Sequence, residues 1–218
     1  MINRDKLIGI KRLWASKEQH RSKQRQDEGH ESMRLPPGQR LVKNWPVLDL
    51  GTQPSISQDG WRLRIGGLVE TPLSMDWGSL HEQNLVETVS DMHCVTTWSR
   101  YDNHWRGWRT KDMLSLVKPK AQARFVMVVS YDGYKTNVPV AALENDQSLL
   151  VISWEGKPLT REHGGPVRLL IPHLYLWKSA KWIKEITFMA DDQRGFWESN
   201  GYHNRADPWR EERYASQE

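Results

Sequence analysis

Residues 124–138 decide the fold, and they read Arg124-Phe125-Val126-Met127-Val128-Val129-Ser130-Tyr131-Asp132-Gly133-Tyr134-Lys135-Thr136-Asn137-Val138. The β-branched run at 125–129 predicts a buried strand, because such side chains fit a pleated sheet. Asp132-Gly133 is a strong turn signal, so residues 134–138 are expected to return as the partner strand of a hairpin. The core is therefore expected to be built on a β-sheet.

Similar short apolar stretches flank this hairpin in both directions along the chain. They lie at Trp61–Ile65, Leu149–Trp154, Val167–Ile171 and Trp182–Phe188. A helix is expected over 110–117, with Thr110 as its N-cap and its apolar side chains facing inward. This alternation of short strands and short helices predicts an α+β fold with mixed or largely antiparallel sheets.

The composition limits the class of protein. A chain of 218 residues favours one domain, or one domain with an extension. Hydrophobic residues make up 38%, enough for one core, and 12 Trp with 6 Tyr argue against full-length disorder. No window approaches the ~18 consecutive apolar residues of a membrane span, so no transmembrane segment is expected.

The positive charge is concentrated in an N-terminal arm. Residues 1–43 carry eleven Lys and Arg against five Asp and Glu, whereas residues 44–218 have a net charge of −2. Such a body differs from a uniformly basic nucleic-acid-binding domain, so no nucleic-acid partner is required. We expect an arm at 1–37 that adds little to the core, and a domain at 38–218 with a C-terminal wrap. A short helix in the arm would bury Leu7, Ile10, Leu13 and Trp14 on one face.

Cys94 is the only cysteine, so an internal disulfide is excluded. The first residues show no apolar signal-peptide core, and together these features predict a cytoplasmic location. The residue types alone leave two interpretations open for Cys94, an inert buried thiol and a soft metal ligand. A nucleophile paired with His93 is disfavoured, because neighbouring side chains on a strand point to opposite faces. A zinc site is disfavoured because no second cysteine is present.

A second cluster of polar residues lies at 162–182. Gly164-Gly165 allows a close approach of the backbone to a ligand. Arg168, Lys178, Ser179 and Lys181 supply the charged and hydroxyl donors that suit a phosphate. The alternative is an ordinary glycine turn followed by a strand with solvated lysines.

Taken together, these motifs resemble the molybdopterin-binding domain of the sulfite oxidase family, and most closely its short, stand-alone bacterial members. The segments that carry the resemblance are His93–Ser99, Trp105–Gly107, Tyr131–Tyr134, Gly164–Arg168, Lys178–Lys181, Gly195–Glu198, Gly201–His203 and Asp207–Trp209. The resemblance covers roughly residues 40–210. It implies a sulfite-oxidase-type fold, one molybdopterin per chain and two-electron oxygen-atom transfer at molybdenum.

The resemblance also implies roles for individual residues. Cys94 matches the cysteine whose thiolate binds molybdenum. Expected contacts to the pterin and its phosphate are Asn44, Trp45, His93, Ser130, His163, Arg168, Lys178, Ser179, Ala180 and Lys181. The protein would thus supply one metal ligand, a phosphate anchor and a shaped pocket, while the cofactor supplies the redox chemistry.

The chain departs from the family at the substrate side. Sulfite oxidases have an Asn-Arg pair after the cysteine, whereas Val95-Thr96-Thr97-Trp98 follows Cys94 here. Arg100 and Arg106 are the nearest cations and are the expected catalytic residues beside Cys94. This mixed environment favours S-oxide or N-oxide reduction over sulfite oxidation. No haem-binding segment is recognised, so we expect the electrons to be exchanged with a separate electron-transfer partner. No dimerisation segment is recognised either. The expected substrate is a small molecule.

The tryptophans offer an alternative of another class. Trp98, Trp105, Trp108, Trp177 and Trp182 crowd the same motifs. A groove lined by them could bind a ligand without any cofactor, as a Trp-rich ligand-binding module, or they could simply pack the core. The sequence predicts no particular oligomeric state.

Overall fold

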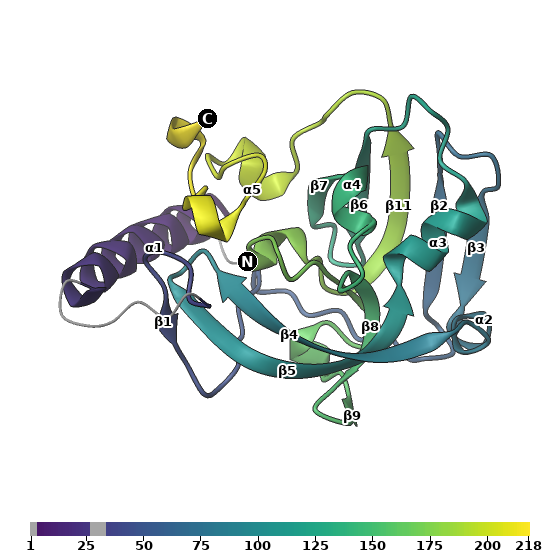
Figure 1. Cartoon of the computed structure of the whole chain (residues 1–218), viewed down its shortest axis with the longest axis horizontal. Coiled ribbons are helices and arrows are strands. Elements are labelled where there is room, and N and C mark those ends of the chain that lie inside the picture. The colour runs from purple at the N-terminus through teal and green to yellow at the C-terminus, as the bar shows by residue number, and fades with distance from the viewer. Residues whose placement is uncertain (1–3, 27–33) are drawn as a thin grey trace.

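The computed structural model describes the backbone of residues 4–26 and 34–218, with the side chains of 5–17 and 34–218. Two mixed β-sheets with short helices around them make up the fold, so the expected α+β class is confirmed (Figure 1). Each sheet is antiparallel except for one parallel pair, β1 with β5 and β2 with β11.

The smaller sheet has five strands in the order β3-β2-β11-β6-β7. Its strands are β2 (Arg62–Gly67), β3 (Leu73–Asp76), β6 (Phe125–Ser130), β7 (Lys135–Pro139) and β11 (Ile183–Met189). The predicted hairpin is confirmed, since β6 and β7 pair antiparallel with Val126 opposite Val138. Val126, Val128 and Val138 are fully buried, which explains why the β-branched run forms a strand.

The larger sheet has six strands and carries a long hairpin that the sequence analysis did not single out. Its strands are β1 (Arg40–Leu41), β4 (Leu85–Cys94), β5 (Trp98–Arg109), β8 (Leu149–Trp154), β9 (Lys157–Pro158) and β10 (Arg168–Leu170). The hairpin β4–β5 ends at Cys94, which is opposite Trp98. At the bulge between Arg106 and Gly107, a side chain on Gly107 would lie 2.4 Å from the Leu150 carbonyl oxygen, so this strand needs glycine there.

The helices are short apart from the first. They are α1 (Arg4–Gln26), α2 (Trp77–His81), α3 (Thr110–Val117), α4 (Val140–Leu143) and α5 (Phe196–Ser199), with 3₁₀ turns at η1 (Arg161–His163) and η2 (Leu176–Lys178). Helix α3 has the expected bounds, but Thr110 as N-cap is wrong. Arg109 is the N-cap, and the Thr110 hydroxyl donates instead to the carbonyls of Leu143 and Ser148. In the described part of the chain, no helix is long and apolar enough to cross a membrane.

Helix α1 packs on the body through a different face from the expected one. Ile8 and Ala15 are buried, whereas Ile10 and Leu13 are 57% and 65% exposed. Residues 8, 11 and 15 share one helical face, and small Ala15 allows the helix to approach closely. The arm therefore contributes more to packing than its polar composition predicts. Residues 27–33 lie outside the described part, so no structure is assigned to them.

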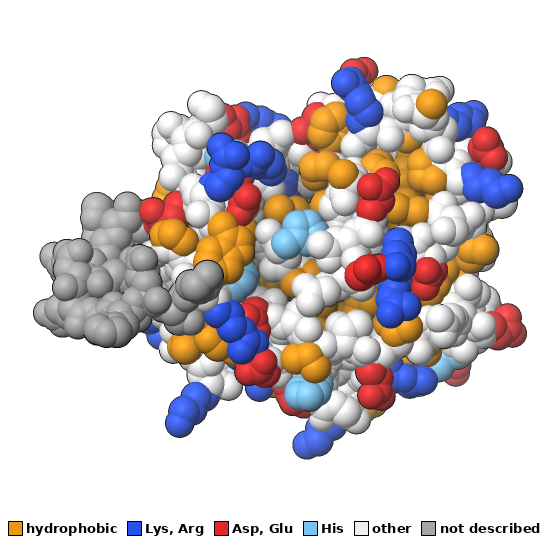
Figure 2. Space-filling view, viewed as in Figure 1, with side chains coloured by type: hydrophobic (Ala, Val, Ile, Leu, Met, Phe, Trp, Pro, Cys, Tyr) orange, Lys and Arg blue, Asp and Glu red, His pale blue; other side chains and the backbone are white. Residues whose placement is uncertain are grey.

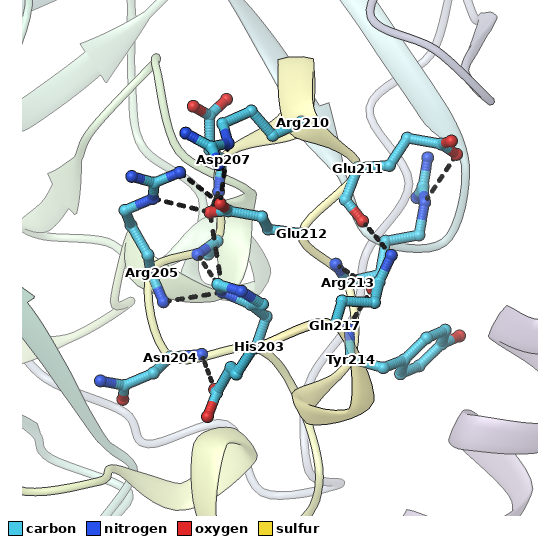
Figure 3. A network of polar contacts seen from close by, with 12 residues as sticks. His203, Asn204, Arg205, Asp207, Arg210, Glu211, Glu212, Arg213, Tyr214 and Gln217 are labelled. Atoms are coloured by element: carbon cyan, nitrogen blue, oxygen red, sulfur yellow. Dashed lines mark hydrogen bonds and ion pairs between the residues drawn. The ribbon is translucent and has the colours of Figure 1, made fainter.

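The C-terminal segment after α5 enters the core. Ala206 and Arg213 are fully buried. Figure 3 shows the polar contacts that fix this segment: Glu212 accepts from Arg205 Nε at 2.9 Å and from the Asp207 amide at 3.0 Å. The segment lies beside α1 in Figure 1, and a side chain on Gly201 would come within 2.9 Å of Arg12.

Candidate functional site

The tip of the β4–β5 hairpin positions Cys94. Cys94 is the last residue of β4, and the Thr97 amide donates to its carbonyl at 3.0 Å to close the turn. Thr97 has φ +69°, a left-handed conformation that is unfavourable for a β-branched residue. Strained turns of this kind are concentrated at functional sites, because the surrounding structure must hold them.

Both ends of the chain hold this turn in place. Gln39 Nε2 donates to the Cys94 carbonyl at 3.1 Å. From the C-terminal segment, the fully buried Arg213 donates to the carbonyls of Val95 at 2.8 Å and Pro37 at 3.2 Å. Sequence analysis missed Gln39 and Arg213, because their partners lie far away along the chain.

The Cys94 thiol is buried, with 4% of the residue exposed, and Thr96 Oγ1 lies 3.1 Å from Sγ. Burial raises the pKa of the thiol, while the Thr96 hydrogen bond and the charges of Arg213 and Lys11 oppose this rise. Within the described residues, no group of three His, Cys, Asp or Glu could hold a metal ion.

Cys94 lines a cavity of about 140 Å³. Much of its wall is aromatic, formed by Trp14, Trp45, Trp98, Tyr134, Trp177, Trp182, Trp197 and Tyr202.

We call the part of the cavity wall formed by Arg168 and Lys181 its cationic end. Arg168 lines it and is 3% exposed. Its guanidinium donates to the carbonyls of His163 at 2.9 Å and Ser179 at 2.7 Å, and no described carboxylate forms an ion pair with it. Burial lowers the pKa of Arg168 to about 10. A buried cation without an acidic partner is costly, which indicates an anionic ligand at this end.

Lys181 adds a second cation at the same end. Its Nζ donates to the Glu162 carbonyl at 2.6 Å, and burial, together with the charge of Arg168, lowers its pKa to about 8. Gly164 has φ +104°, and a side chain there would lie 2.9 Å from Lys181 Cβ. The glycine is thus required by the close approach of two chain segments that form the cationic end.

Five other predicted contacts also line the cavity. The His163 ring stacks on Trp45 with centroids 4.0 Å apart, and burial lowers the pKa of His163. Ser130 is buried, and its hydroxyl has no hydrogen-bond partner among the described residues. Ser179 and Ala180 follow η2, and the Ser179 hydroxyl accepts from the Ile171 amide at 2.9 Å. The structure thus brings Trp45, Ser130, His163, Arg168, Ser179, Ala180 and Lys181 into the cavity of Cys94.

Five predicted site residues do not line this cavity. Asn44 is exposed, and His93 is bonded to Ser99 Oγ at 2.8 Å. Lys178 is fully buried in an ion pair with Glu198, 2.6 Å from Nζ to Oε1. Arg100 stacks over the Trp154 ring and pairs with Glu155. Arg106 is exposed and lines a separate depression. Side chains alternate along β5, so Arg106 points away from the buried face of the strand, where Trp105 lies.

The cavity also contains residues that sequence analysis did not assign to the site. Lys11 and Trp14 reach it from α1, and Asp49 reaches it from the segment after β1. Asp49 Oδ1 accepts from the Gly51 amide and Oδ2 from Gln53 Nε2. The helical spacing of Lys11 from Ile8 and Ala15 was the only signal that could have found it.

The donor set fits an anionic cofactor that carries a soft metal. A buried thiol lies in the same cavity as the guanidinium and ammonium of the cationic end and a Ser130 hydroxyl that is unpartnered in the described part of the chain. Thiolates bind soft metals, and guanidinium and ammonium groups bind phosphates. Aromatic walls suit a planar ring system.

Comparison with known proteins identifies the family. The model for the oxidoreductase molybdopterin binding domain matches residues 50–197. The uncharacterized oxidoreductase YuiH of Bacillus subtilis is 40% identical over 188 residues, which is 86% of this chain and 95% of that protein.

Two further relatives have more specific names. The putative protein-methionine-sulfoxide reductase subunit YedZ1 of Azospira oryzae is 29% identical, and the protein-methionine-sulfoxide reductase catalytic subunit MsrP of Campylobacter jejuni is 27% identical. Each match covers 66% of this chain and 54% of the relative, so the chain spans about half their length. Among solved structures, the sulfane dehydrogenase SoxCD of Paracoccus pantotrophus matches with a TM-score of 0.60. The match covers 72% of this chain and 46% of that chain. Because the sequence identity is 18%, this likeness shows the fold alone.

Proposed function

Because the chain belongs to the oxidoreductase molybdopterin-binding domain family and is a molybdopterin-dependent oxidoreductase, we propose that it transfers oxygen atoms at a molybdenum held by Cys94. The observation that carries the proposal is the single cavity that joins the Cys94 thiol to the cations of Arg168 and Lys181. The proposal includes one pterin per chain, because Cys94 is the only cysteine that could hold its metal. Membership of an enzyme family disfavours the alternative of a cofactor-free Trp-rich module.

The residues around the cavity have distinct tasks in this proposal. Arg168 and Lys181 bind the phosphate arm, and the Ser130 hydroxyl donates to the pterin. Cys94 binds as a thiolate, a form that a metal favours despite the burial that raises the pKa of the free thiol. Thr96 Oγ1, 3.1 Å from Sγ, donates to that thiolate. When bound, the cofactor supplies the two-electron redox centre that exchanges an oxygen atom.

The proposed reaction is the reduction of an S-oxide or N-oxide. In the S-oxide case the sulfur–oxygen bond breaks, and two electrons and two protons yield the sulfide and one water. The electrons come from a separate electron-transfer partner. The aromatic wall supports a substrate whose reacting S-oxide or N-oxide group is uncharged, as do the positions of Arg100 and Arg106, which do not line the cavity. The sulfoxide reductases among the relatives also support it.

The proposal includes a reducing compartment, the cytoplasm. Cys94 has to remain a free thiol to bind the metal, and it is a free cysteine in this structure. Reducing compartments keep thiols in that state.

The test is Cys94→Ser in protein loaded with molybdenum. A hydroxyl is a harder and weaker ligand than a thiolate, so dye-driven reduction of dimethyl sulfoxide and the thiolate-to-metal absorption band should both be lost. The pterin should be largely retained, because Arg168 and Lys181 remain. Ser99→Ala is a matched control on the same hairpin. Full reductase activity in Cys94→Ser would contradict the assignment of Cys94, and efficient sulfite oxidation without reductase activity would contradict the direction.

A further inference from the structure

Helix α1 places a cation and an aromatic ring in the wall of the cavity that Cys94 also lines. Ile8 and Ala15 anchor the helix on the body, and Lys11, between them on the same face, points into the cavity. Trp14, one turn after Lys11, also lines the cavity and is 42% exposed. Helix α1 lies outside residues 50–197, the part that matches the family model.

Lys11 has no partner of its own in the described part of the protein. Its ammonium is half-buried and forms no hydrogen bond or ion pair with a described residue. The nearby carboxylate of Asp49 already accepts bonds from Gly51 and Gln53. Burial lowers the pKa of Lys11, while the charges of Asp49 and Cys94 oppose this. An unpaired, partly desolvated ammonium indicates an anionic ligand.

Lys11 comes from a different part of the chain than the phosphate anchor. Helix α1 lies outside the family-model match, whereas Arg168 and Lys181 lie within it. The charge of Lys11 influences the pKa of the Cys94 thiol and that of Lys181. The rings of Trp14, Trp197 and Tyr202 line the same cavity. In the cavity of Cys94, the protein thus offers the ammonium of Lys11 and apolar walls.

We propose that Lys11 is a specificity-determining residue that binds an anionic group on the substrate, while Trp14 contacts the apolar part. The inference rests on the proposed function and narrows its substrate class to S-oxides or N-oxides that carry a carboxylate or a similar anion. Arg100 and Arg106, which the sequence places near Cys94, do not line the cavity and leave this task to α1.

The test compares two substrates of nearly equal shape, 4-(methylsulfinyl)benzoate and the neutral 4-(methylsulfinyl)benzamide. In wild-type protein loaded with molybdenum, kcat/KM should be roughly tenfold or more higher for the benzoate, the range of a charged hydrogen bond. Lys11→Met should remove this preference through KM and leave the benzamide unchanged. Lys11→Arg should keep most of it. Lys17→Met, an exposed lysine on the same helix, is the control and should change nothing.

Two further measurements separate the possible failures. Molybdenum per chain should be equal in wild type and Lys11→Met; a loss would show that Lys11 holds the cofactor and would overturn the inference. Binding of the sulfone 4-(methylsulfonyl)benzoate is followed by calorimetry. If wild type reduces neither sulfoxide but binds this sulfone in a Lys11-dependent way, the proposed reaction fails and the inference stands. Equal kcat/KM for both sulfoxides in wild type would overturn the inference and leave the proposed function intact.

Discussion

At the residue scale, Arg168 serves both the fold and the proposed cofactor site. It donates to two buried carbonyls, and it forms part of the cationic end of the cavity. Leaving a buried acceptor without a donor costs about 1–3 kcal/mol, and a charged hydrogen bond contributes about 1.5–3 kcal/mol. A single substitution should therefore change both stability and cofactor content.

We expect Arg168→Ala to lower molybdenum per chain about tenfold or more and to lower the melting temperature of the cofactor-free protein. Arg168→Lys keeps the charge and should retain more of both. Arg124→Ala, which removes an exposed arginine, is the control. Elemental analysis and thermal unfolding measure the two effects. Unaltered molybdenum in Arg168→Ala would show that the pterin lies elsewhere.

Lys181 should make anion binding depend on pH. Burial lowers its pKa to about 8, so the ammonium loses its proton in the free protein as the pH rises from 7 to 9. Because an anion binds the protonated form, the affinity of the cofactor-free protein for pyrophosphate should fall over this interval. Because the pKa of Lys181 is lower in the folded protein than in the unfolded chain, the unfolded chain binds more protons between about pH 8 and 10. This group should therefore make the free energy of unfolding rise over that interval.

Calorimetric titration with pyrophosphate measures the first effect. Lys181→Met should bind more weakly at pH 7 and show a flatter pH profile, whereas the exposed control Lys184→Met should match wild type. A profile that is equally steep in Lys181→Met would assign the titration to another group.

At the element scale, packing of α1 can be tested with two isoleucines on different faces. Ile8 is 8% exposed and Ile10 is 57% exposed. Truncating a buried isoleucine to alanine typically costs about 2–5 kcal/mol, whereas exposed substitutions usually stay within about 0.5 kcal/mol. Ile8→Ala should therefore lower the free energy of unfolding more than Ile10→Ala. Urea unfolding measures both, and equal effects would contradict the orientation of the helix.

At the scale of the whole molecule, the two ends of the chain enclose the site. Gln39 and Arg213 hold the turn at Cys94, and Lys11 and Trp14 line the cavity from α1. On the face drawn in Figure 2, Lys and Arg side chains are interspersed with Asp and Glu among the described residues. The anion selectivity that we propose therefore rests on Lys11 inside the cavity.

Deleting residues 1–26 should open the cavity. In the cofactor-free protein, the Cys94 thiol, now 4% exposed, should react faster with a disulfide reagent, and the melting temperature should fall because Ile8 and Ala15 lose their packing. The charge-rich arm by itself predicts almost no effect. Leu13→Ser, at a position 65% exposed, is the control. Unchanged thiol reactivity would show that α1 does not cover the cavity.

Local patterns in the sequence determined much of this protein. The β-branched run at 125–129 predicted β6, because a pleated, half-buried surface favours such side chains. The lone Cys94 and the cluster at 163–181 marked two parts of the cavity wall, and the resemblance they carried named the family. These signals work because the residues in each motif lie close together along the chain.

Only the tertiary structure decided which distant residues complete the site. Gln39 and Arg213 meet the Cys94 turn across 55 and 118 positions, and their pairing depends on how the chain ends fold back. Arg100 and Arg106 lie near Cys94 in sequence, yet the partners and alternation of β5 turn them away from the cavity. Lys11 reaches it because Ile8 and Ala15 dock α1. Packing between remote elements, which leaves no local pattern, brings this charge into the cavity of the thiol.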